Sequence, residues 1–193
     1  GAANAGLIIA AADELHFAPA SNWNGAANTL TAVLIEDSGG SVSTDASTDD
    51  CSSTGGATVY STATVVLSHT VNAANDLPAN AGDTATATED TSYDSWTADS
   101  DWGYTDVDGD AMHQILIVTT VGAGTLAVDA NGNDACDSGE EVAAGSTTVA
   151  DESLATLEFC PAADSVASTT FTYKVHDGTG YSGVGTMTIS ITA

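Results

Sequence analysis

Basic residues are almost absent from this chain of 193 residues. Lys174 is the single one, no Arg occurs, and 27 acidic residues give a net charge of −26. Because proteins displace the counterions of phosphate backbones with Lys and Arg, this deficit excludes nucleic-acid binding and disfavours anionic membranes. A compact fold of such charge repels itself unless divalent cations or a very saline medium neutralise it. The acidic residues cluster at ligand spacing, which favours cations over salt and over a plain solvated acidic surface.

Long apolar runs and cysteines are scarce as well. No stretch approaches the roughly 20 apolar residues of a membrane span, so we expect no membrane insertion. The chain begins at Gly1 without a signal peptide, and we expect that a leader or longer precursor was removed. Cys136 and Cys160 both lie in the second half, which favours a disulfide between them. Cys51 would then be left over or bonded to another chain; three reduced cysteines are the alternative.

Short alternating segments separated by Gly, Asn and Asp turns run through the chain, and no segment keeps a 3.6-residue period. The clearest strand pattern places Met187, Ile189 and Ile191 on one face. Together these patterns predict an all-β fold, a β-sandwich. The predicted strands are 7–9, 15–17, 30–35, 58–71, 115–119, 124–128, 154–159, 171–175 and 186–192.

Two segments of the chain repeat each other. Residues 15–20 (Leu-His-Phe-Ala-Pro-Ala) match 157–162 (Leu-Glu-Phe-Cys-Pro-Ala), and each is followed by a strand, an acidic turn and a Thr-rich strand. Residues 72–78 separate the copies as a linker, since Pro78 cannot continue a ladder. We therefore expect a partial sandwich at 1–71, consisting of a C-terminal half, and a complete one at 72–193.

An ordered set of motifs carries a family resemblance. It comprises Asn-Asp-Leu-Pro at 75–78, Glu-Asp-Thr at 89–91, Asp-Val-Asp-Gly-Asp at 106–110, Gly-Thr-Leu at 124–126, Leu-Glu-Phe-Cys-Pro at 157–161 and Val-His-Asp-Gly at 175–178. In this order the motifs closely resemble the bacterial cadherin-like tandem repeats of large surface adhesins, over 72–193 and the half-repeat in 1–71. The resemblance implies immunoglobulin/cadherin-like sandwiches in tandem, stiffened by calcium, on a cell surface or in an extracellular fibre, without a catalytic centre.

The segment 129–140 has the ligand spacing of an EF-hand calcium loop. Oxygen side chains occupy loop positions 1, 3, 5, 9 and 12, and position 7 would contribute its backbone carbonyl. The sixth position, normally Gly in a left-handed turn, is Asp134. The alternative is an acidic hairpin connection held by Asx-turns and a disulfide at Cys136. The predicted Ca²⁺ ligands are Asp129, Asn131, Asn133, Ala135, Asp137 and Glu140.

A second acidic cluster is predicted around residue 108. In a strand-like segment Asp106, Asp108 and Asp110 share one face, and three convergent carboxylates repel unless a cation lies among them. The family resemblance implies a calcium site at the junction between modules, where further ligands join them. An exposed Asp-Gly turn is the alternative. The further ligands implied by the resemblance are Asn75, Asp76 and Glu89, with Glu36 and Asp37 from the preceding copy.

Catalysis has little support. The four His are scattered without zinc-site spacing, and no Gly-x-Ser-x-Gly elbow occurs. A two-carboxylate glycosidase is disfavoured because each acidic cluster already has a turn or metal interpretation. Trp23, Trp96 and Trp102 could form a sugar-stacking platform, although Trp23 resembles a loop aromatic that anchors packing in the family.

We therefore expect a secreted structural or adhesive module and not an enzyme. A half-sandwich exposes an inner face and unpaired edges, so its expected partners are neighbouring repeats of a longer chain or other copies of itself, joined head to tail in a filament. The apolar run 7–9 is a candidate strand for such exchange. The alternative is a carbohydrate-binding module of a secreted multidomain protein, with surface glycans as its partner.

Overall fold

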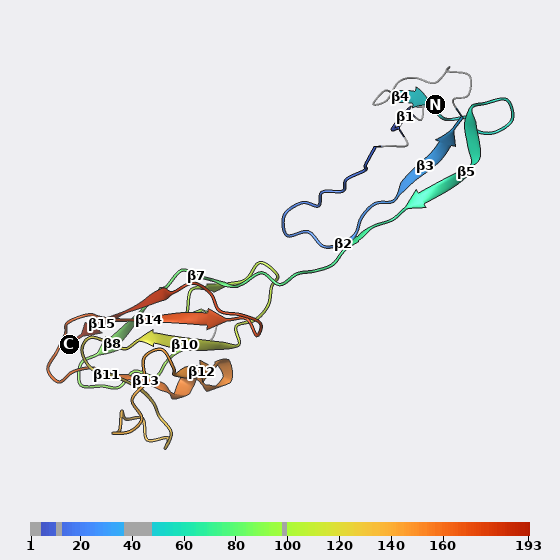
Figure 1. Cartoon of the computed structure of the whole chain (residues 1–193). Coiled ribbons are helices and arrows are strands. Elements are labelled where there is room, and N and C mark those ends of the chain that lie inside the picture. Colours follow the sequence, from blue (N-terminus) through green and yellow to red (C-terminus); the bar gives the residue numbers. More distant parts are fainter. Residues whose placement is uncertain (1–4, 11–12, 37–47, 98–99) are drawn as a thin grey trace. The chain divides into compact units, whose positions relative to one another are not determined.

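The computed structural model describes residues 5–10, 13–36, 48–97 and 100–193. The chain forms two compact units, Gly1–Ala74 and Asn75–Ala193, whose regular structure is almost entirely β (Figure 1). Among the described residues, no helix is long and apolar enough to cross a membrane. The predicted all-β class is confirmed.

The second unit is a sandwich of two layers. One layer is a five-stranded sheet in which β8 and β15 are parallel and all other neighbours antiparallel. Its order is β12 (Thr148–Ala150), β10 (Gln114–Thr119), β14 (Thr169–His176), β15 (Gly185–Thr192) and β8 (Asp83–Thr88). The other layer pairs β11 (Thr125–Val128) with β13 (Leu157–Cys160), and a bridge adds Tyr93 beside Phe159. A short pair, β7 (Ala79–Asn80) and β9 (Tyr104–Thr105), completes the unit.

The core lies between these layers because each strand buries alternate residues. Met187, Ile189 and Ile191 are all buried, as the period-2 pattern predicted. An aromatic group fills the centre, where the Trp102 ring lies 5.3 Å from that of Trp96 and 5.0 Å from that of Tyr173. The buried hydroxyl of Tyr173 donates to the Trp102 carbonyl at 2.8 Å. Burial of Trp96 and Trp102 removes both from the sugar-stacking platform considered above.

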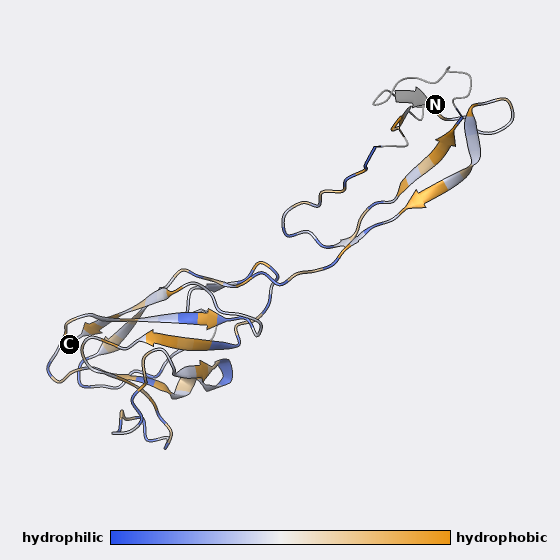
Figure 2. Ribbon diagram, viewed as in Figure 1, coloured by the Kyte–Doolittle hydropathy of each residue, from blue (hydrophilic) through white to orange (hydrophobic). Residues whose placement is uncertain are grey.

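The described residues of the first unit form three separate two-stranded sheets. They pair β1 (Ala5–Leu7) with β4 (Thr48–Asp50), β2 (Gly25–Ala26) with β6 (Thr70–Val71), and β3 (Leu30–Ile35) with β5 (Tyr60–Leu67). Hydrophobic residues predominate in β3 and in the second half of β5 (Figure 2). Tyr60 is the one buried hydrophobic side chain among those described in this unit, whereas Leu34 and Val66 are 73% and 58% exposed.

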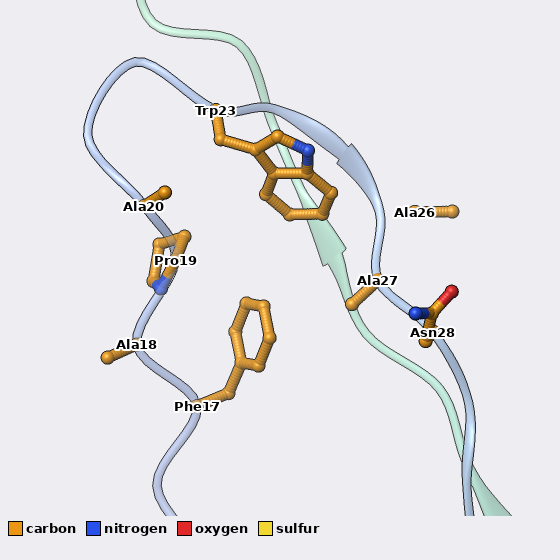
Figure 3. A pocket seen from close by; sticks show the side chains of 8 residues that line it. All are labelled: Phe17, Ala18, Pro19, Ala20, Trp23, Ala26, Ala27 and Asn28. Carbon is orange, nitrogen blue, oxygen red and sulfur yellow. The ribbon is translucent and has the colours of Figure 1, made fainter.

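A shallow hollow lies beside β2 in this unit (Figure 3). The rings of Phe17 and Trp23 meet edge to face with centroids 6.3 Å apart, and His69 lies 5.3 Å from Phe17. Pro19 and several small side chains complete the lining. The packing against Phe17 agrees with an anchoring role for Trp23, although 38% of this side chain is exposed.

Four strand predictions were inaccurate. Residues 15–17 do not form a strand, and their backbone joins no ladder. The Phe17 ring instead packs on those of Trp23 and His69. The predicted strand at 58–71 is interrupted at 68–69, the first predicted strand is shifted to 5–7, and 154–159 begins inside the 3₁₀ helix η1 (Asp151–Thr156). The β8 strand was missed because its buried residues, Ala85 and Ala87, are small and give a weak apolar signal.

Candidate metal centres

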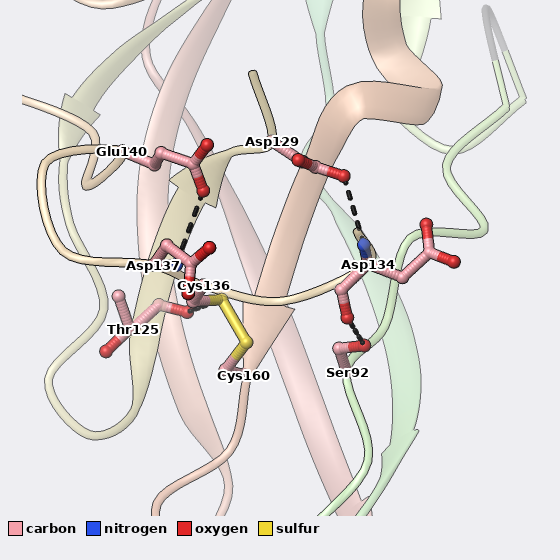
Figure 4. The surroundings of a disulfide bond; sticks show 8 residues. All are labelled: Ser92, Thr125, Asp129, Asp134, Cys136, Asp137, Glu140 and Cys160. Atoms are coloured by element: carbon pink, nitrogen blue, oxygen red, sulfur yellow. Dashed lines mark hydrogen bonds between the residues drawn. A yellow bond between two sulfur atoms is a disulfide. The ribbon is translucent and has the colours of Figure 1, made fainter. Parts of the chain in front are cut away.

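The loop Asp129–Glu140 is anchored at both ends and in the middle. The amide of Val128 donates to the carbonyl of Glu140 at 2.9 Å, and that of Asp129 donates to Thr156 at 2.7 Å. A disulfide joins Cys136 to Cys160 of β13, the two cysteines paired in the sequence analysis (Figure 4). The loop is therefore fastened to both strands of the smaller layer.

The carboxylate of Asp129 organises the first half of this loop. Its Oδ1 accepts hydrogen bonds from the amides of Asn131 and Gly132 at 3.0 and 2.7 Å, and its Oδ2 accepts from Asp134 at 3.1 Å. Burial raises the pKa of Asp129, but the backbone hydrogen bonds outweigh it and lower the pKa below its usual value. Asp129 is therefore held as a carboxylate, the form that binds a cation.

The remaining predicted side chains of the loop converge. Oδ2 of Asp137 accepts from the side-chain amides of Asn131 and Asn133, both at 2.9 Å. Oε1 of Glu140 accepts from Asn131 at 3.3 Å and from the Ala130 amide at 3.0 Å. Rotation of either Asn amide about its terminal bond would turn a carbonyl oxygen to the position of the nitrogen, since the two ends have nearly the same shape. The same four residues can thus present oxygens to a common centre.

An EF-hand loop requires a left-handed residue at its sixth position and a backbone carbonyl ligand at its seventh. Asp134, at the sixth position, has φ of 56°, so it adopts the left-handed conformation usually supplied by Gly. The Ala135 carbonyl, predicted to be the backbone ligand, accepts from the Asp137 amide at 3.1 Å. With carboxylate, amide and carbonyl oxygens as donors, the residues of this loop fit a hard cation that takes six to eight oxygen ligands, which is calcium.

The Asp106–Asp110 cluster is a tight turn and not the strand-like segment predicted. Oδ1 of Asp106 accepts from the amides of Asp108, Gly109 and Asp110 at 2.8, 3.0 and 3.3 Å, and Gly109 has φ of 82°. One carboxylate oxygen from each Asp nevertheless lies within 4.8 Å of the others. Oδ2 of Asp106 is buried without a hydrogen-bond partner in the described part of the chain. The three acids therefore converge because the backbone turns, and not because they alternate along a strand.

The residues added to this cluster by family resemblance divide into two groups. The Asp76 amide donates to Oδ2 of Asp108 at 2.7 Å, and Asn75 contacts Asp177, close to the same end of the sandwich. Glu89 lies elsewhere, because it follows the far end of β8 and donates its amide to Thr192. Six extended residues separate the ends of β8 by roughly 20 Å. Glu89 is therefore not brought to the Asp106 cluster, and Asp37 lies outside the described residues.

Sequence reasoning missed one acidic residue. Glu158 alternates with the core residues Leu157 and Phe159, so its strand position predicts a side chain in water, yet only 1% of it is exposed. The cause is the disulfide-linked loop, which covers the outer side of β13. The sequence signal for this burial is Cys160, two residues later on the same face of the strand, because its disulfide partner brings the loop to that face.

The fold agrees with the comparison to known families. The family model described as bacterial Ig domain matches residues 75–192, more than half of the chain. No curated protein and no solved structure matches the chain. Bacterial Ig domains are structural, non-catalytic modules, typically in extracellular or surface-exposed parts of larger proteins. The chain belongs to the bacterial Ig domain family.

Proposed function

We propose that this chain is an extracellular structural or adhesive module that calcium stiffens and that a second copy completes through β-strand pairing. The loop Asp129–Glu140 is the observation that carries the calcium proposal. Asp129, Asp137 and Glu140 would supply carboxylates, Asn131 and Asn133 amide oxygens, and Ala135 its carbonyl. Bound calcium would reduce the repulsion among these acids, because the chain has a single basic residue, Lys174, against 27 acidic ones.

The Asp106 turn is the second proposed calcium site. Its three carboxylates lie next to Asp76, at the start of the Ig domain, where the preceding unit ends. A cation held there would restrict the first residues of the Ig domain. This role rests on the convergence of the three acids and on Oδ2 of Asp106, which has no hydrogen-bond partner among the described residues.

The strand-pairing proposal rests on the sheet of β3 and β5. Two strands alone are marginally stable, and the exposed Leu30, Leu34, Val65, Val66 and Leu67 leave apolar area in water on this sheet. Addition of a strand from another copy would pair an open edge, and its apolar side chains would pack beside those of the same face and shield part of this apolar area. The candidate donor at 7–9 overlaps β1, whose residues Ala5–Leu7 pair with β4, so donation would first require release of that short pairing.

Calcium removal tests the proposal. The melting temperature of the full chain should fall in excess chelator at fixed ionic strength and recover with Ca²⁺, because saturation to about 100 times Kd adds about 2.7 kcal/mol of stability. Glu140→Gln should weaken the recovery, whereas Glu152→Gln, an exposed acid outside both loops, should not. An unchanged melting curve in chelator would refute the calcium role.

Electron microscopy and light scattering test the assembly. Filaments or concentration-dependent oligomers of the pure chain support completion by a second copy. A monomer at all concentrations would instead point to completion by a neighbouring repeat of a longer chain. Leu34→Glu should abolish assembly, because it places a charge on the sheet proposed to be covered.

Carbohydrate binding is retained as the second candidate because of the exposed ring of Trp23 beside Phe17 (Figure 3). Aromatic faces are suited to stacking on sugar rings. A glycan array should then give a hit that Trp23→Ala abolishes. No hit at high protein concentration would remove this candidate.

A further inference from the structure

Glu158 is a buried acid in the smaller layer of the sandwich. It is 1% exposed, and pairing of β11 with β13 places Ala127 beside it. On its other side, the antiparallel bridge between Tyr93 and Phe159 places Asp94 opposite Glu158. Residues directly opposed in this way point to the same face of a sheet, and like charges there are destabilising.

A third carboxylate joins this pair from the loop. Ser92 donates its hydroxyl to the Asp134 carbonyl at 2.9 Å, which holds the loop against the segment before Asp94. One carboxylate oxygen each from Asp94, Asp134 and Glu158 lies within 4.8 Å of the other two. Three strands or loops distant in sequence thus direct acids to one point.

Among the described residues, no lysine or arginine lies beside these acids. Lys174, the only Lys, lies on β14 between the buried Tyr173 and Val175, so alternation directs it to the outer face of the opposite layer. Oε2 of Glu158 is buried and has no hydrogen-bond partner among the residues described. Cys136 and Cys160 also lie near Glu158, but their disulfide removes them as metal ligands.

A proton or a cation could relieve this repulsion. Burial, followed by the charges of Asp129, Asp134, Asp94 and Glu140, raises the pKa of Glu158. Among the described residues, a proton on Oε2 would still lack an acceptor, and the carboxyl groups of the exposed Asp94 and Asp134 would still lie beside it. A cation would satisfy Oε2 and attract both neighbours at once, which the proton cannot do.

We propose that Glu158, Asp94 and Asp134 bind a calcium ion, at a site separate from the ligands of the Asp129–Glu140 loop. The donors are all carboxylate oxygens, which suit calcium, and the partly exposed setting leaves room for water to complete its coordination. Such an ion would pin the loop and the 92–94 segment to β13. The site does not depend on calcium binding by the loop itself, because the two ligand sets share no side chain.

Calorimetric titration of the full chain with Ca²⁺ tests this site. Glu158→Gln should bind one ion fewer per chain, and Asp94→Asn should weaken the same binding step by about tenfold or more, since affinity follows the charge of the ligands. Glu140→Gln should affect a different step, and Glu152→Gln none. Because Asp94 is exposed, Asp94→Asn keeps the test decisive if Glu158→Gln fails to fold.

Terbium luminescence gives a second readout. Tyr93 adjoins Asp94, and its ring lies 4.7 Å from that of Trp96, so excitation of these rings should sensitise Tb³⁺ at the site. In a Glu140→Gln background, the emission should fall when Glu158→Gln is added, and the emission that remains should come from the Asp106 turn beside Tyr104. Equal ion counts and affinities for wild type, Glu158→Gln and Asp94→Asn would overturn the proposal.

Discussion

The side chain of Asn75 donates to Oδ2 of Asp177 at 2.9 Å, across 102 positions of sequence. Oδ1 of Asp177 accepts from the amides of Thr179 and Gly180, so this carboxylate holds the turn after β14 as well. The contact ties the first residue of the matched Ig domain to the turn between its two longest strands. This hydrogen bond therefore fixes the first residue of the Ig domain to a turn of the same unit.

Acid should remove this stabilisation. Burial raises the pKa of Asp177, but the hydrogen bonds from Asn75, Gly180 and Thr179 outweigh it and lower the pKa to about 2. Because this folded value lies below the unfolded value of about 3.9, the stabilisation is complete above roughly pH 4 and lost as the pH falls toward 2. Urea unfolding of Asp177→Asn should therefore show a shallower loss of stability than wild type over this range. Glu152→Gln is the charge-matched control and should lose stability as steeply as wild type. An Asp177→Asn slope equal to that of wild type would contradict this prediction.

Loss of the Cys136–Cys160 disulfide should lower the free energy of unfolding by about 3 kcal/mol, as expected for a crosslink that closes a loop of this order. Urea unfolding of the Cys136→Ser/Cys160→Ser double variant would measure it. Calcium affinity should fall as well, because the disulfide anchors the middle of the Asp129–Glu140 loop. Cys51→Ser is the control, since Cys51 belongs to the other unit. Equal stability of the double variant and this control would show that the crosslink contributes nothing.

Tyr173→Phe should destabilise the Ig domain by about 1–3 kcal/mol, because the Trp102 carbonyl would lose its buried donor while the ring packing stays. Chemical denaturation monitored by Trp fluorescence would report the change. Tyr181→Phe serves as the comparison. The Tyr181 hydroxyl accepts a hydrogen bond from the Gln114 side chain in a partly buried setting, where water can replace the hydroxyl. A larger loss for Tyr181→Phe would contradict the assignment.

The predictable parts of this fold are those encoded by local alternation. The burial of Met187, Ile189 and Ile191 required only the two-residue period of a strand. The convergence of Asn131, Asp137 and Glu140 required only the spacing of an EF-hand sequence, and calcium binding by this loop stays a prediction. Glu158 has the same alternation as a solvent-facing residue, and its burial arises from a loop that crosses it in three dimensions. The family resemblance predicted Glu89 beside Asp106. Strand β8 instead carries Glu89 to the other end of the sandwich, which the order of the motifs does not reveal.

Gly109→Ala tests whether turn geometry creates the Asp106 cluster. A Cβ at Gly109 would contact nothing within 4 Å, so the substitution acts only through its φ of 82°, which Ala adopts at a cost of roughly 1–2 kcal/mol. The turn should open, release the amides from Oδ1 of Asp106 and weaken any cation binding by Asp108 and Asp110. Gly183→Ala is a matched control, because its Cβ also enters open space but φ is not left-handed. Denaturation and Ca²⁺ titration of both variants should separate them; equal behaviour would mean that the strained turn does not assemble the cluster.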